Sequence, residues 1–180
     1  MTTWAEFETA EPELADRVRR SFDAGRHKTI ATLRADGSPR ISGIECEFVD
    51  GELRFGSMSR SRKGADLHRD PRFALHGPPV HPVPGEESSW PGEAKVAGRA
   101  ISRGPISAAA QAGASGDQAS GDQASGDQAS GDDTAAEVAD GEFFVADVEE
   151  VVVTHLDDTA TRLVVEWWTP SGGRRRIERD

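Results

Sequence analysis

Residues 28–57 read KTIATLRADGSPRISGIECEFVDGELRFGS, and this stretch decides the fold. Three parts of it have the patterns of half-buried strands. Lys28–Leu33 is alternating and rich in β-branched residues, Arg40–Val49 alternates apolar with polar side chains in its second half, and Glu52–Ser57 places Leu53 and Phe55 on one face. The dipeptides Asp36-Gly37 and Asp50-Gly51 separate them, and both are typical of tight turns. The stretch therefore predicts an antiparallel meander of three strands.

Outside this stretch, an amphipathic helix is predicted at Glu13–Ala24, within about residues 12–25, because apolar residues recur every four positions between Pro12 and Gly25. A short helix at Ser61–Arg69 ends before Pro71. The remaining strands are expected at Arg72–His76, Ala94–Ile101, Glu142–Val148, Val151–Leu156 and Arg162–Trp168. Gly98 suggests a bulge or a close backbone approach. These elements predict a mainly β (α+β) chain that forms a small barrel.

A low-complexity segment interrupts the strands. Ala-Ser-Gly-Asp-Gln repeats run from Ala114 to Gln128, and residues 107–136 contain no large apolar side chain. Such a segment cannot bury enough surface to offset the entropy of ordering. We therefore expect one domain over residues 1–180, with a disordered insert at about residues 103–140.

Composition excludes several classes of protein. The 180 residues carry 21 basic and 32 acidic side chains, a net charge of −11, which disfavours nucleic-acid binding. No apolar run approaches the roughly 20 residues of a membrane span, and the first residues do not resemble a secretory signal. Cys46 is the only cysteine, and the five histidines lack metal-ligand spacing. These features predict a cytoplasmic, soluble protein without a disulfide or a metal site.

One segment is basic although the chain as a whole is acidic. Between Arg54 and Arg72 there are six basic and two acidic residues. Within it, Ser57, Ser61, Arg62 and Lys63 lie where a strand turns into a helix. Hydroxyls, free N–H groups at a helix start and an Arg-Lys pair suit a phosphate monoester. A plain basic surface, or an anion- or nucleic-acid-binding module that uses these cations, would have the same composition.

The strand–turn–strand around Asp36–Pro39, followed by Ser61-Arg62-Lys63 and Asp70-Pro71, resembles the pyridoxamine 5′-phosphate oxidase superfamily. The similarity is clear from about Thr29 to Gly77 and fainter towards the C-terminus. It implies a six-stranded antiparallel split β-barrel with flanking short helices. It also implies a homodimer with a flavin, FMN, in a groove between the subunits.

The resemblance assigns cofactor-binding roles residue by residue. The strand along the flavin would begin with Arg40, Ile41, Ser42, Gly43 and Ile44. Ser57 and Ser61 would contact the phosphate, and Arg62 and Lys63 would neutralise it. Trp168 and Arg179, eleven positions apart, match an aromatic and an arginine at the cofactor edge. Their alternative roles are an interface aromatic and a solvated tail arginine.

Departures from the family pattern bear on the substrate. Glu45, Glu93 and Ile177 stand where oxidases of the vitamin have lysine, glutamine and histidine. We therefore expect a flavin-dependent oxidoreductase for a small organic substrate, and not a genuine pyridoxamine phosphate oxidase. The flavin would carry the redox chemistry, so no catalytic residue is assigned. Two alternatives stay open: a reductase that uses a deazaflavin coenzyme, and a non-catalytic protein that binds flavin or haem.

Overall fold

The computed structural model describes residues 1–105 and 141–179. Its helices are α1 (Trp4–Ala10), α2 (Pro12–Asp23), α3 (Arg62–Arg69) and a 3-10 turn, η1 (Glu87–Ser89). Its strands are β1 (Lys28–Leu33), β2 (Pro39–Ile44), β3 (Cys46–Val49), β4 (Glu52–Met58), β5 (Arg72–His76), β6 (Glu93–Pro105), β7 (Gly141–Leu156), β8 (Leu163–Thr169) and β9 (Gly173–Arg179). Within the described ranges, no helix has the length and apolar character needed to cross a membrane.

The predicted strand Arg40–Val49 is bent at Glu45, and this bend closes the barrel. Its first half, β2, pairs with β1, whereas its second half, β3, pairs with β4. All pairs along the order β2-β1-β5-β6-β7-β4-β3 are antiparallel. Because β2 and β3 are consecutive parts of one strand, the sheet returns to its starting point with six strands around it. The predicted mainly β, antiparallel split barrel is confirmed.

The strand β7 is longer than expected and connects the barrel to an extension. The segments Glu142–Val148 and Val151–Leu156, predicted as two strands, form one strand of 16 residues. Its first half pairs with β4, and its second half pairs with β8, which in turn pairs with β9. The strand β9 was missed because all seven of its residues are exposed and it reads as a charge run. Cross-strand pairing with β8 holds it in place.

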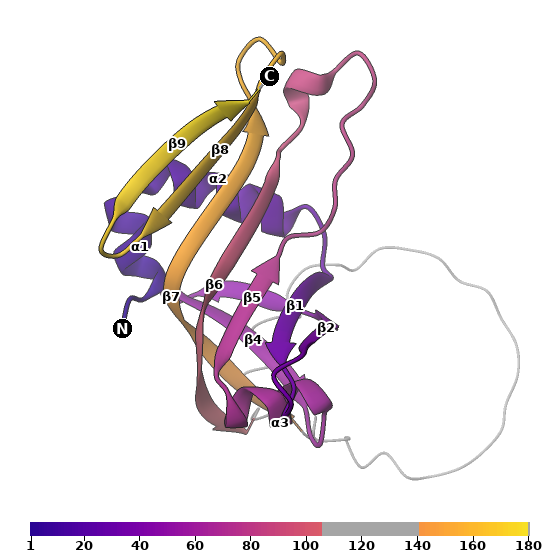
Figure 1. Ribbon diagram of the computed structural model, residues 1–180, viewed down its shortest axis with the longest axis vertical. Coiled ribbons are helices and arrows are strands. Elements are labelled where there is room, and N and C mark those ends of the chain that lie inside the picture. The colour runs from indigo at the N-terminus through magenta and orange to yellow at the C-terminus, as the bar shows by residue number, and fades with distance from the viewer. Residues whose placement is uncertain (106–140, 180) are drawn as a thin grey trace, which may run out of the picture.

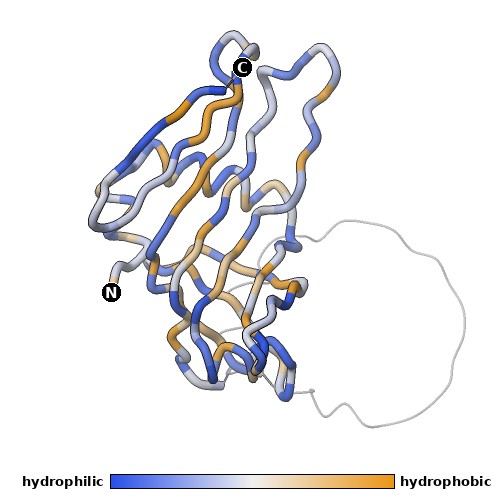
Figure 2. Tube along the Cα trace, viewed as in Figure 1, coloured by the Kyte–Doolittle hydropathy of each residue, from blue (hydrophilic) through white to orange (hydrophobic). Residues whose placement is uncertain are grey.

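Helices α1 and α2 cover one face of the sheet, behind β6 and β7 in Figure 1. The prediction for α2 is confirmed, but α1 was missed. Thr3 and Glu6 form a capping box at its start, a signal that is readable in the sequence. Trp4 and Phe7 are fully buried, and the ring of Phe7 lies 4.8 Å from that of Trp168. Figure 2 shows apolar residues alternating with polar ones along the strands.

The expected boundary of the insert needs correction. Arg103, Gly104 and Pro105 belong to β6, so its ordered part extends beyond Ile101. The rest of the predicted disordered insert, residues 106–140, lies outside the described residues. Strand pairing of Pro105 with Glu142 explains why β6 continues this far.

The prediction of a bulge or close approach at Gly98 is confirmed. The register between β6 and β7 shifts at Ala97/Gly98, and a Cβ on Gly98 would lie 1.9 Å from the carbonyl oxygen of Asp147. Only a residue without a side chain allows the two backbones to approach so closely.

We therefore predict that Gly98→Ala lowers the free energy of unfolding by about 3 kcal/mol, at the upper end for a forced overpacking. Denaturant unfolding followed by circular dichroism measures the change. Gly43→Ala is the control, because a Cβ on this strand glycine meets nothing within 4 Å. Equal stability of the two variants would contradict the close approach at Gly98.

Candidate functional site

The end of β4 and the start of α3 form a tight turn. Arg60 has a left-handed backbone, with φ 57°, and the N–H of Ser61 donates to the carbonyl of Met58. The Ser61 hydroxyl caps α3 by accepting from the N–H of Gly64 at 3.1 Å. The first N–H groups of a helix lack intrahelical acceptors, so those of Arg62 and Lys63 stay available at this end.

Gly64 brings α3 close to the end of β4. A Cβ at this position would lie 2.8 Å from the Ser57 hydroxyl and 3.2 Å from a carboxylate oxygen of Glu142. The hydroxyls of Ser57 and Ser61 are hydrogen-bonded to each other. Glu142 is also paired with His68, whose Nε2 lies 2.7 Å from Oε2. The serines and these two titratable groups therefore share one side of α3.

The two cations of the motif have different surroundings. Arg62 is exposed, and no hydrogen bond or ion pair of its side chain is seen among residues 1–105 and 141–179. Lys63 reaches back to the barrel, where its Nζ donates to the carbonyl of Gly43 at 2.8 Å. Partial burial lowers the pKa of Lys63. One of its three N–H donors is thus used, and the others are available to a ligand.

Asp66, one turn into α3, is the buried centre of an ionic network that sequence reasoning missed. Its Oδ2 accepts from Arg40 Nε at 2.6 Å and from the Thr32 hydroxyl at 3.0 Å. Its Oδ1 accepts from Arg69 Nη2 at 2.8 Å. Burial by itself would raise the pKa of Asp66, but these hydrogen bonds lower it to about 2. The carboxylate is therefore ionised at neutral pH.

A pocket of about 420 Å³ opens between α3 and the turn that joins β1 to β2. Its lining comprises four arginines, two aspartates and two alanines: Arg34, Ala35, Asp36, Arg40, Arg62, Ala65, Asp66 and Arg69. Four positive and two negative charges leave a formal net charge of +2. In a protein whose net charge is −11, this pocket favours an anion.

The structure brings together most of the residues predicted for cofactor binding. Ser57, Ser61, Arg62 and Lys63 lie at the start of α3, and Arg40 reaches α3 from β2. In β2, Ile41 and Gly43 are exposed, Ser42 is half-buried, and Ile44 is in the core. Arg40 is not a free cation, since it is held by Asp66 at 2.6 Å.

Trp168 and Arg179 lie elsewhere in the chain, on the β8–β9 hairpin. Trp168 is 6% exposed and packs on Phe7 in the core. The neighbouring Trp167 points to the opposite face, where its cross-strand partners are Val152 and Arg175. Trp167 is therefore the tryptophan of this hairpin that faces away from the core. Sequence reasoning missed it because adjacent residues of a strand face opposite sides of the sheet, and the sequence alone does not show which of the two tryptophans faces the core.

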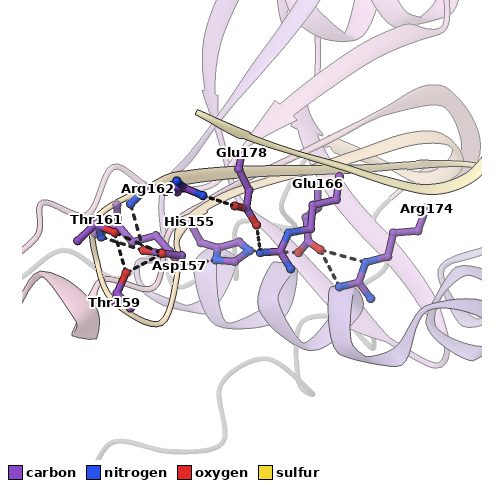
Figure 3. A network of polar contacts seen from close by, with 10 residues as sticks. His155, Asp157, Thr159, Thr161, Arg162, Glu166, Arg174 and Glu178 are labelled. Carbon is purple, nitrogen blue, oxygen red and sulfur yellow. Dashed lines mark hydrogen bonds and ion pairs between the residues drawn. The ribbon is translucent and has the colours of Figure 1, made fainter. Parts of the chain in front are cut away.

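A second charged network holds the same hairpin (Figure 3). Glu166, almost fully buried, accepts from Arg174 at 2.8 Å and lies 3.1 Å from His155 Nε2. The other ring nitrogen of His155 contacts the carbonyl of Leu156. Burial opposes the charge on Glu166, but hydrogen bonds from Arg174 and His155 lower its pKa. The network joins β7, β8 and β9, and so has a structural role.

No group of three or more histidine, cysteine, aspartate or glutamate side chains that could hold a metal occurs in the part of the chain that the structure describes. The exposed Glu45, at the position where vitamin oxidases have lysine, forms an ion pair with Arg26 at 2.9 Å.

The ionic network predicts acid sensitivity. The pKa of Asp66 is about 2 in the folded chain and returns to about 4 on unfolding, so its contacts stabilise above pH 4 and are lost as the pH falls towards 2. Asp66→Asn should lower the free energy of unfolding by about 3 kcal/mol at pH 7, because Arg40 loses its partner.

Denaturant unfolding at pH 7, 4 and 2.5 measures both effects. The loss of stability between pH 4 and 2.5 should be smaller in Asp66→Asn than in the wild type. It should not vanish, because Asp70 and Asp157 also have pKa values of about 2, lowered by hydrogen bonds from Arg72 and Thr159. An identical pH profile in the variant would show that Asp66 is not ionically paired.

Comparison with known proteins supports the fold. No protein-family model matches the sequence, and no curated protein is significantly similar to it. Among solved structures, a pyridoxamine 5′-phosphate oxidase-related FMN-binding protein from Nostoc punctiforme superposes with a TM-score of 0.53 at 16% identity, covering 98% of each chain. PhzG from Burkholderia lata, solved with tetrahydrophenazine-1-carboxylic acid, gives 0.51 at 13% identity, covering 97% of this chain and 88% of that one.

A protein from Clostridium acetobutylicum related to general stress protein 26 also gives a TM-score of 0.51, at 8% identity over 94% of this chain and 95% of that chain. At these identities the likeness concerns the fold and not the activity. The resemblance read from residues 29–77 is confirmed at that level: the chain has the split-barrel fold of pyridoxamine 5′-phosphate oxidase-like proteins.

Proposed function

We propose that the chain binds FMN through its phosphate at the start of α3 and acts as a flavin-dependent oxidoreductase on a small organic substrate. One observation carries the proposal. The exposed guanidinium of Arg62 has no side-chain partner among the described residues, and it lies at a helix start beside Lys63 and an arginine-lined pocket. A cation left without a carboxylate in an acidic chain is suited to a ligand anion.

The residues present fit a phosphate monoester. The helix start offers the N–H groups of Arg62 and Lys63, and the partial positive charge of the helix end adds to them. Arg62 can form a bidentate hydrogen bond with the phosphate, and the ammonium group of Lys63 provides a compact positive charge. The carboxylate of Glu142 lies close to the serines, and its Oε2 is 2.7 Å from His68 Nε2.

The outer surface of β2 fits the rest of the cofactor. Ile41 is 76% exposed, and the neighbouring Gly43 has no atom within 4 Å of a Cβ position, so a flat ring can approach the backbone. FMN supplies the redox chemistry when bound, and the chain supplies binding, orientation and exclusion of water. This division of roles agrees with the absence of an assigned acid–base residue.

A homodimer is part of the proposal. On the face of the β7–β9 sheet away from the helices, cross-strand pairing aligns apolar side chains in rows: Val152 beside Trp167, and Val165 beside Ile177. We call these four residues the hairpin face. No described helix covers it, because α1 and α2 lie on the other side of the sheet, behind it in Figure 1. Apolar patches of this kind are typical of protein interfaces, and a second copy would cover both faces symmetrically.

The proposed phosphate contact can be tested by substitution of Lys63. Lys63→Ala should weaken FMN binding by about 10- to 100-fold, equivalent to about 1.5–3 kcal/mol for a charge-assisted contact. Riboflavin, which lacks the phosphate, should bind both proteins equally. Fluorescence titration of the purified protein measures both affinities, and the melting temperature should hardly change.

Arg72→Ala is the control, since Arg72 is exposed and paired with Asp70 at 2.6 Å, outside the pocket. Equal FMN affinity in Lys63→Ala and the wild type would place the phosphate elsewhere. If the wild type binds a deazaflavin coenzyme at micromolar concentration and not FMN, the fold serves that cofactor instead. Binding of neither would refute the proposal.

The proposed dimer interface can be tested by substitution of Ile177. Ile177→Asp puts a charge on the hairpin face, at its outer strand β9, so it should convert the dimer into a monomer, as measured by light scattering after gel filtration. Val83→Asp is the matched control, because Val83 is 53% exposed in the loop between β5 and β6. A monomeric wild type, or a dimeric Ile177→Asp variant, would exclude this interface.

A further inference from the structure

We infer that Asp66 is the positioning residue of this site: it holds Arg40 so that its guanidinium faces the phosphate, and it thereby sets the preference for FMN over riboflavin. The inference rests on the proposed function and extends it from the exposed cations to a buried carboxylate.

The geometry of the contacts supports this role. Asp66 binds Arg40 through Nε, at 2.6 Å. Within the described part of the chain, the two terminal nitrogens of that guanidinium form no hydrogen bond or ion pair. The side chain of Asp66 is 4% exposed and that of Arg40 is 17% exposed, so neither can swing freely. Both line the pocket that also contains Arg62. The anchor thus leaves the outer edge of the guanidinium for a ligand.

Three elements fix the carboxylate itself. Thr32 donates to it from β1, Arg40 from β2, and Arg69 from the next turn of α3. Arg69 also donates to the carbonyl of Leu33 at 2.6 Å. Since the hydrogen bonds come from separate elements, the position of Arg40 relative to the start of α3 is set before any ligand arrives. Such preorganisation reduces the entropy lost on binding.

The sign of the charge distinguishes this role from a purely electrostatic one. The negative charge of Asp66 offsets one positive charge in a pocket proposed to bind an anion. On charge alone, its loss would therefore strengthen FMN binding. If its main effect is to hold Arg40, its loss weakens FMN binding although the pocket becomes more positive. A purely structural role would lower stability and change the affinities for FMN and riboflavin by the same factor.

The experiment compares FMN with riboflavin on the full chain by fluorescence titration. In Asp66→Asn, the ratio of the riboflavin to the FMN dissociation constant should fall about 10-fold, the loss expected when one charge-assisted contact to the phosphate is misplaced. The matched control is Asp70→Asn, which removes the same charge at the end of the same helix but from a carboxylate paired with Arg72. This control should keep the wild-type ratio.

An unchanged or increased ratio in Asp66→Asn overturns the inference. If that variant does not fold, Arg40→Lys decides, because it keeps the charge but loses the anchored guanidinium: a fall in the ratio supports the inference, and the wild-type ratio overturns it. Failure of the wild type to bind FMN is a different result, since it removes the proposed function as well.

Discussion

The buried carboxylate of Asp66 determines how α3 sits on the barrel. It accepts hydrogen bonds from Thr32 on β1, from Arg40 on β2 and from Arg69 on its own helix. A buried carboxylate is costly unless it is fully paired, and here the pairing comes from the three sides of one corner of the fold. The start of α3 is therefore held at a fixed place beside the end of β4. The backbones of Arg62 and Lys63, which begin the helix, are held in place with it.

The bend at Glu45 has the corresponding role in the sheet. Because β2 pairs with β1 and β3 with β4, one continuous strand closes the barrel and brings the first hairpin next to α3. The helices α1 and α2 then cover one side of the sheet, and the hairpin of β8 and β9 is left open on the other. The open face carries the apolar side chains of Val152, Val165, Trp167 and Ile177 with Arg175 beside Trp167, whereas the pocket beside α3 is lined mainly by charged side chains.

Much of this could be predicted from local patterns. The alternation of Lys28–Leu33 and the turn at Asp50-Gly51 depend on neighbouring residues, so the meander was recognised, as was the bulge at Gly98. The role of Asp66 could not be predicted, because its partners Thr32 and Arg40 lie 34 and 26 positions away. Which face of the hairpin Trp167 and Trp168 each occupy likewise depends on a strand register that only the pairing with β7 and β9 determines. The strand β9 was missed because nothing in its exposed, arginine-rich sequence indicates burial.

The place where a phosphate meets the chain can be measured without a change in sequence. Backbone amide signals, recorded by ¹H–¹⁵N correlation spectroscopy during titration with inorganic phosphate and then with FMN, report on each residue separately. The amides of Arg62 and Lys63 should shift most, and they should shift in the same direction with both ligands. If the largest shifts fall on residues far from the start of α3, or if FMN moves no signal there, the chain does not hold a phosphate at this helix.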